Sequence, residues 1–397
     1  MDFTLSEPEL AVDELAGRLF GDHASPERLR AAEEGAGPPF DRDLWTALAD
    51  AGLLGTAVPE EAGGLGLGLV ALARLLEHAG RTAAPVPALA TLGYAVPPIV
   101  RFGTPALRDA LLPGVLDGST VLTAALAEPL GDPRRPATTA RTEVSGEVSG
   151  AGAEGGGPGS SGAGPGPGGG WVLSGTKTCV PAGMIADAIL VSATTETGAG
   201  LFLVDPAAPG VTRRAQRTIA WAVEAELELT DVRVAPTAAV GPLDTSALDW
   251  TLARATTASC AVMAGVVDEA LRLTSLHTRT REQFGHPIAG FQAVRQRLAD
   301  GFIDARAIRW TAAEALWRLD EGLPAAKEVA VAKLIAASGG RRVTRAAQHL
   351  HGATGVDRTY PVHRCYVLAK QLELALGGVS RQAAALGALL ADEPLPA

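Results

Sequence analysis

The chain has 397 residues, enough for two or three units around a sizeable core, and its 47% hydrophobic and 20% charged residues are typical of a globular protein. The net charge of −10 argues against nucleic acid as the main ligand, although the residues from Asp244 onward carry 18 Lys and Arg against 15 Asp and Glu. The first ten residues are acidic and polar, and no apolar run reaches the roughly 18 residues that span a bilayer, so we expect neither a secretory signal nor a membrane segment.

The cysteines and histidines show no spacing typical of a disulfide framework or a metal site. The three cysteines lie far apart without a CxxC pair, so we expect reduced core thiols in a cytoplasmic protein. The histidines near the C-terminus likewise lack the spacing of metal ligands, and we expect no bound metal. These residues are Cys179, Cys260, Cys365, His349, His351 and His363.

Residues 1–118 are expected to be helical. Leu44, Leu48 and Leu53 lie near helical spacing, and Pro59 ends that element. The glycine-rich run 63–68 resembles a phosphate-binding loop, but it follows a Pro-Glu-Glu-Ala turn and not a strand. We therefore interpret it as a turn between helices.

Residues 119–240 are expected to form a small antiparallel β unit. Hydrophobic residues alternate with Glu224, Glu226 and Glu228 over 223–229, a pattern typical of a half-exposed strand. Residues 145–170 are almost wholly Gly, Ala, Ser, Pro and Glu, which bury too little apolar surface to order themselves. We expect that stretch to be a disordered surface loop.

Residues 241–397 are expected to form a bundle of long helices. Apolar side chains between Phe291 and Ile308, with Phe302 among them, follow steps of three and four and predict one buried face. The chain is therefore predicted to run from a helical unit through a β unit to a helical bundle.

Six motifs occur in order along nearly the whole chain. They are Val58-Pro59-Glu60-Glu61, Ala127-Glu128-Pro129, the run 171–177, the run 281–288 with Phe291 and Gln292, the run 351–355, and Tyr360-Pro361-Val362. Together they resemble the acyl-CoA dehydrogenase family, and the run 281–288 is the most specific match. The resemblance implies an α+β multidomain fold with an N-terminal helical domain (1–118), a central antiparallel β domain (119–240) and a C-terminal four-helix bundle (241–397).

The resemblance also implies FAD as cofactor and an acyl-CoA thioester as substrate. In this family a carboxylate removes the α-proton while the flavin accepts the β-hydrogen as hydride. The adenosine and pyrophosphate of FAD commonly reach a neighbouring subunit. The implied FAD-binding residues are Arg281, Phe284, Gln292, His349, Gly352 and Ala353, of which His349 stands where the family usually has Gln and Ala353 replaces a Gly.

The positions that usually surround the flavin ring depart from the family pattern. A small turn usually follows the Glu-Pro pair, but this chain has Leu130 and Gly131 there. Cys179 replaces the usual aromatic residue near the flavin. Pro181 replaces the usual hydroxyl residue and has no backbone N–H.

No carboxylate stands at either position where this family carries its base. The usual position falls on Leu376, and the position used by other members falls on Ala255, between Arg254 and Thr256. Leucine and alanine cannot abstract a proton. Glu373, about one helical turn before Leu376, is the one nearby substitute.

Three hypotheses remain. The first is a base-lacking subunit of a heterotetramer with a homologous acyl-CoA dehydrogenase subunit, as in actinobacterial steroid and related acyl-CoA degradation. The second is a self-sufficient, self-associating homotetramer with a non-standard base such as Glu373. The third, a non-enzymatic DNA-binding relative on the same fold, is disfavoured because the basic excess of the bundle is small.

Overall fold

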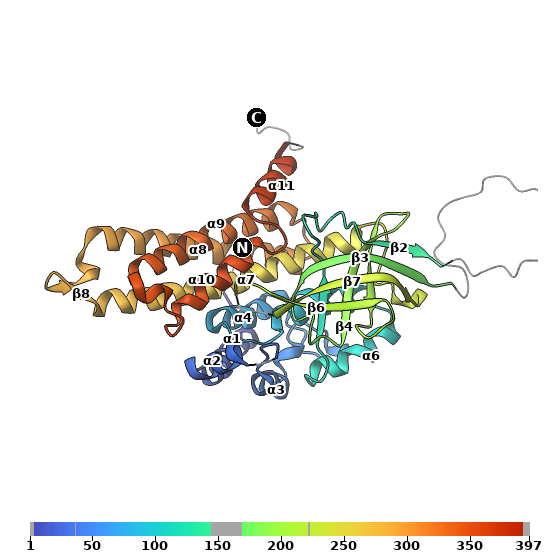
Figure 1. The fold of residues 1–397 in the computed structure, drawn as a ribbon, viewed down its shortest axis with the longest axis horizontal. Helices are drawn as coiled ribbons and strands as arrows, with labels where there is room; N and C mark the ends of the chain where they lie inside the picture. The colour runs from blue at the N-terminus through green and yellow to red at the C-terminus, as the bar shows by residue number, and fades with distance from the viewer. Residues whose placement is uncertain (1–3, 36, 144–168, 221–222, 392–397) are drawn as a thin grey trace, which may run out of the picture.

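The computed structural model describes residues 4–35, 37–143, 169–220 and 223–391. The loop predicted at 145–170 therefore lies almost entirely outside the described residues. Figure 1 shows the three expected parts: helices of the N-terminal third, a sheet beside them, and long helices extending away from the sheet.

The N-terminal part is helical, as predicted. Asp41 begins α3 by accepting a hydrogen bond from the Leu44 backbone N–H at 3.0 Å, and the Trp45 indole donates to the Gly118 carbonyl at 3.1 Å. The glycine-rich run 63–68 is a turn that leads into α4. The helices are α1 (Glu7–His23), α2 (Pro26–Glu34), α3 (Arg42–Asp50), α4 (Gly68–Thr82), a π-helical segment η3 (Leu89–Ala95), α5 (Val96–Phe102) and α6 (Pro105–Leu116).

The central sheet is mixed, which corrects the prediction of a purely antiparallel unit. Its strand order is β1-β4-β2-β3-β7-β6, with β5 paired to β4, and β1 runs parallel to β4. The parallel pair arises because the chain passes through β2 and β3 between those two strands. The strands are β1 (Leu122–Ala125), β2 (Thr139–Thr142), β3 (Trp171–Val180), β4 (Ala188–Thr194), β5 (Ala199–Val204), β6 (Val211–Arg217) and β7 (Val223–Val234).

The C-terminal part is a bundle of α7 (Ser246–Thr280), α8 (Gln292–Asp320), α9 (Ala326–His351) and α10 (Val362–Leu374), followed by α11 (Val379–Ala391). Glycines let α7 approach α4 closely, since a Cβ added at Gly265 would lie 1.8 Å from the Glu77 carbonyl oxygen. Phe302, predicted in the buried stripe of α8, is instead 54% exposed beneath the Arg306 guanidinium.

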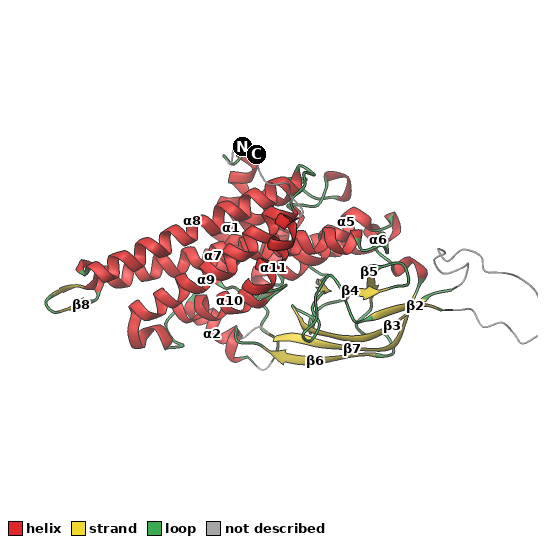
Figure 2. Cartoon of the chain, turned by 90° about the horizontal axis from the view of Figure 1, so that it is seen from above, coloured by secondary structure: helices red, strands yellow, loops and turns green. Residues whose placement is uncertain are grey.

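The tip of the α7–α8 hairpin lies at the far end of the bundle from the sheet (Figures 1 and 2). It is a short two-stranded ribbon, β8 (Glu282–Gln283) with β9 (His286–Pro287). Across the described ranges no single helix has the length and apolar composition to cross a membrane, whereas α10 and α11 reach them only together, with a 41° bend between.

Candidate cofactor and acyl-binding sites

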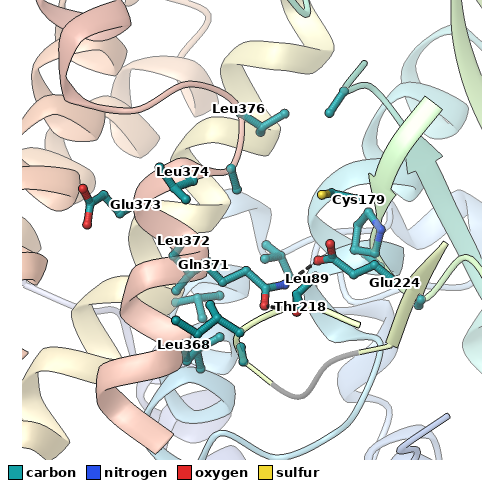
Figure 3. Close-up of a pocket in the computed structure, with 18 of the residues that line it drawn as sticks. Leu89, Cys179, Thr218, Glu224, Leu368, Gln371, Leu372, Glu373, Leu374 and Leu376 are labelled. Carbon is teal, nitrogen blue, oxygen red and sulfur yellow. Dashed lines mark hydrogen bonds between the residues drawn. The ribbon is translucent and has the colours of Figure 1, made fainter. Parts of the chain in front are cut away.

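A cavity of about 1110 Å³ lies between the N-terminal helices, the sheet and the bundle. The sheet contributes Cys179 and Glu224 to its wall, and the C-terminal part contributes Gln371 and Leu376 (Figure 3). Pro181, in the turn after β3, also lines the cavity. A mostly apolar cavity of this size with a few polar groups is typical of a small-molecule site. It is the candidate site for an acyl group and a flavin ring.

The two positions expected for the base lie in one apolar cluster. Leu376 packs against buried residues that include Ala255, Leu126 and Tyr94. Ala255 on α7 is fully buried, and its side chain is a methyl group that cannot act as a base. The structure thus brings together two positions far apart in sequence, and both present hydrocarbon.

The cavity wall contains strained backbone. Cys179, Ala182 and Leu376 have φ angles of 49°, 52° and 56°, in the left-handed region that non-glycine residues rarely adopt. Cys179 is exposed to the cavity side of the sheet, which corrects the prediction of a core thiol, whereas Cys260 and Cys365 are buried. All three cysteines are free.

Glu224, a residue missed from the sequence, lies in the cavity wall. The alternating pattern predicts that it lies on the exposed face of its strand, but only 5% of its surface is exposed. The Gln371 side-chain amide donates to Glu224 Oε1, and the Thr218 hydroxyl donates to Gln371 Oε1 at 2.7 Å (Figure 3). Glu224 Oε2 has no hydrogen-bond partner among the described residues. Burial raises the pKa of Glu224 to about 7.

The neighbouring glutamates explain why the sequence pattern misled. Glu226 and Glu228 are half-buried and pair with Arg214 on β6 at 3.3 and 2.7 Å, whereas Glu224 lies opposite Gln216. The alternation of the strand is therefore correct for two of the three acids. Glu224 differs from the other two because its cross-strand neighbour is Gln216 and because Gln371 of α10 covers it.

Glu373, the possible substitute base, is held by basic neighbours. Its carboxylate lies 3.1 Å from Lys370 Nζ. Burial lowers the pKa of the nearby Lys333 amine, and the charge of Glu373 offsets part of that effect. Part of Glu373 lines the cavity, but its carboxylate points away from Glu224, Gln371 and Leu376 (Figure 3).

A buried ion pair anchors the loop beside the cavity. Lys177 is fully buried, and its Nζ lies 2.6 Å from Glu128 Oε1 and 2.9 Å from the Ser192 hydroxyl. Burial lowers the pKa of Lys177 to about 8, partly offset by Glu128. The loop that follows places Leu130 fully exposed with a φ of 57°.

The three residues of the nucleotide-binding motif lie together at the hairpin tip. Arg281 is exposed at the end of α7, and Gln292 is the first residue of α8. Phe284 is 90% exposed and contacts Phe291 edge to face, with ring centroids 6.1 Å apart. This tip lies at the opposite end of the bundle from the sheet (Figure 2), and the sheet forms part of the cavity wall.

The other predicted nucleotide-binding residues lie near the same end of the bundle. His349, Gly352 and Ala353 are exposed at the end of α9 and the start of the following 3₁₀ helix η6 (Gly352–Val356). His351, between them in sequence, stacks on His277 of α7 with ring centroids 4.4 Å apart. Burial, His351 and the nearby Arg281 charge all lower the pKa of His277.

FAD fits the tip better than the cavity. At the tip an exposed arginine and the N-terminus of α8, which has no acidic residue in its first turn, suit a pyrophosphate, and Phe284 offers a flat surface for an adenine. In the cavity, Pro181 has no N–H to offer the flavin ring, and Glu224 places a carboxyl group beside Cys179. The tip therefore fits the nucleotide half of FAD, whereas the cavity wall does not fit a reacting flavin ring.

Groups of three or more His, Cys, Asp or Glu side chains arranged to hold a metal do not occur in the described part of the chain. The predicted lack of a metal site remains a prediction.

Comparisons with known proteins agree with this architecture. The model for the acyl-CoA dehydrogenase N-terminal domain matches residues 6–119, and that for the C-terminal domain matches residues 246–387. The chain is 36% identical to acyl-CoA dehydrogenase FadE27 of Mycobacterium tuberculosis, over 99% of this chain and 100% of the relative.

Solved structures give the same result over nearly the full length. A variant of the Tcur3481-Tcur3483 steroid ACAD is 43% identical, covers 98% of this chain and 99% of its own, and has a TM-score of 0.87. The ChsE4-ChsE5 complex of Mycobacterium tuberculosis is 36% identical, covers 99% and 100%, and has a TM-score of 0.88. The chain belongs to the acyl-CoA dehydrogenase family, whose members are oxidoreductases that act on the CH–CH group of acyl-CoA thioesters.

Proposed function

We propose that this chain is the base-lacking subunit of a heteromeric, FAD-dependent acyl-CoA dehydrogenase, assembled as a heterotetramer with a homologous subunit that carries the base. The observation that carries the proposal is the apolar cluster formed by Leu376 and Ala255. A general base must be a titratable side chain within reach of the proton that it removes. Neither position of this chain supplies one.

In this proposal the chain contributes the nucleotide-binding tip to its partner. FAD supplies the hydride acceptor, and its ring lies in the cavity of the partner. Arg281, Phe284 and Gln292, with the end of α9, hold the adenosine and pyrophosphate. The placement of this tip at the end of the bundle away from the sheet (Figure 2), which lines the chain's own cavity, supports a role in a neighbouring subunit.

The relatives support the choice of partner and substrate. One is named the Tcur3481-Tcur3483 steroid ACAD and another the ChsE4-ChsE5 complex. We therefore propose that a homologous acyl-CoA dehydrogenase completes the enzyme, and that steroid acyl-CoA thioesters are the first substrates to test. The three free cysteines agree with the proposed cytoplasmic location.

Turnover of the chain with and without its partner tests the proposal. The chain is expressed alone and together with homologous subunits that carry a glutamate at the position of Leu376, and α,β-dehydrogenation is measured with an artificial electron acceptor. We expect turnover only in the mixed assembly, and we expect it to be lost when the partner's glutamate is changed to glutamine. Turnover by the isolated chain would contradict the proposal and favour the self-sufficient homotetramer.

A further inference from the structure

The cavity of this chain keeps a large volume although its wall lacks a base. Four carboxylates line it, Glu33, Glu128, Glu224 and Glu373, together with three arginines, Arg341, Arg364 and Arg381. Three of the carboxylates are in ion pairs. Glu33 pairs with Arg364 at 2.6 Å, Glu128 with Lys177 at 2.6 Å, and Glu373 with Lys370 at 3.1 Å. Glu224 is the cavity-lining carboxylate without an ion pair among the described residues.

Glu224 is placed to recognise a ligand group. Gln371 fixes one carboxyl oxygen and is itself fixed by Thr218, so the orientation of the carboxyl group is set by a bridge between the sheet and α10 (Figure 3). Among the described residues the second oxygen has no hydrogen-bond partner by geometry, and the exposed Cys179 thiol beside the carboxyl group is only a weak donor. A buried polar atom without a partner costs free energy that a ligand can recover.

We propose that this cavity binds an uncharged, mainly apolar molecule whose hydroxyl group hydrogen-bonds to Glu224, and that the same carboxyl group disfavours an anionic group at that position. The apolar part of the ligand would contact Leu89, Leu368 and Leu372, which line the cavity around Gln371. The inference goes beyond the proposed function and rests on it only in requiring that no flavin ring fills this cavity.

A hydroxyl group suits this site better than an ammonium or a carboxylate. It can donate to the ionised form of Glu224 and accept from the protonated form, so it pairs with Glu224 on either side of its pKa of about 7. An ammonium pairs only with the ionised form and loses its hydration in an apolar cavity. A carboxylate is repelled by the ionised form.

Three naphthalene probes of matched shape test the proposal: 2-naphthol, 2-methoxynaphthalene and 2-naphthoate. Their binding to the full chain is measured by calorimetry and by probe fluorescence at pH 7.5. Wild type is expected to bind naphthol about tenfold more tightly than the methyl ether, which cannot donate, and to bind naphthoate most weakly. The preference for naphthol reports the hydrogen bond, and the rank of naphthoate reports the charge.

Substitutions at Glu224 separate the two effects. Glu224→Gln keeps the shape and removes the charge, so naphthoate should bind about tenfold more tightly than to wild type and the naphthol preference should shrink. Glu224→Leu removes the acceptor, and naphthol and the ether should then bind equally. Glu226→Gln, on the same strand but beside Arg214, should leave all three affinities unchanged. Circular dichroism and thermal unfolding confirm that each variant folds.

Three results would overturn the proposal: naphthoate binding wild type as tightly as naphthol, an unchanged order of affinities in both Glu224 variants, or no binding of any probe. Flavin absorbance of the isolated chain separates this failure from failure of the proposed function. One flavin per isolated chain would contradict the proposed function. A flavin-free chain that does not show the expected order of probe affinities would contradict this inference alone.

Discussion

The hairpin tip and the cavity wall carry two halves of one chemistry and differ in almost every physical respect. The tip is exposed and presents Arg281, Phe284 and the N-terminus of α8 to a neighbouring molecule. The cavity wall lacks a carboxylate at Leu376 and Ala255 and carries the buried Glu224, which has no ion pair among the residues that the structure describes. Because the two regions lie far apart on the same bundle, one can change while the other keeps its role.

The largest expected effect is on the scaffold of the cavity wall. Lys177→Met leaves Glu128 without its buried cation, and we expect the free energy of unfolding to fall by about 3–5 kcal/mol. Arg141→Met breaks the exposed pair with Asp231 on the same sheet and should cost less than about 1 kcal/mol. Denaturant unfolding of both variants measures the difference, and equal losses would contradict the structural role given to Lys177.

The charge of Glu224 predicts a pH-dependent stability. Its pKa in the folded chain, about 7, is above the ordinary value of 4.5, so the folded state favours the protonated form. The contribution of Glu224 to the stability of the folded state is fully present below pH 4.5, where the group is protonated, and is lost as the pH rises through 7 and the group ionises. Glu224→Gln should therefore gain stability over wild type between pH 5 and pH 8, by up to about 3 kcal/mol. A stability difference that stays constant between those pH values would contradict the burial of this carboxyl group.

The tip predicts a loss of cofactor without a loss of fold. In the assembly with its partner, Arg281→Ala should weaken FAD binding about tenfold or more, because a charge-assisted contact to the pyrophosphate is removed. Arg279→Ala, at an exposed arginine two residues before Arg281 and outside the motif, serves as the matched control. Flavin release on dilution reports the affinity, and equal retention in both variants would show that the tip does not hold FAD.

The smallest expected effect is at Glu373. Its carboxylate is paired with Lys370 and points away from the cavity residues of Figure 3. Glu373→Gln should therefore change the turnover of the assembly by less than about twofold, whereas loss of a general base costs about 10²–10⁴-fold. A loss in the latter range would identify Glu373 as the base and support the self-sufficient enzyme.

The comparison also shows which features the sequence reveals. The nucleotide-binding motif of the tip can be recognised in the sequence because its residues lie close together, from Arg281 to Gln292. The order of helical, β and helical parts can be predicted from the change of hydrophobic period along the chain. The period does not reveal the strand directions, and β1 pairs in parallel with β4. Glu224 was missed because alternation predicts faces only where nothing covers the outer face, and α10 covers it there through Gln371. Phe302 was misplaced because helical spacing defines an apolar stripe and not what packs on it.

The flavin-to-chain ratio of the purified assembly tests the central claim most directly. If this chain holds FAD only for its partner, the mixed assembly will contain about one flavin for every two chains, and the isolated chain will contain almost none. One flavin on every chain, in the assembly or in the isolated protein, would contradict the account.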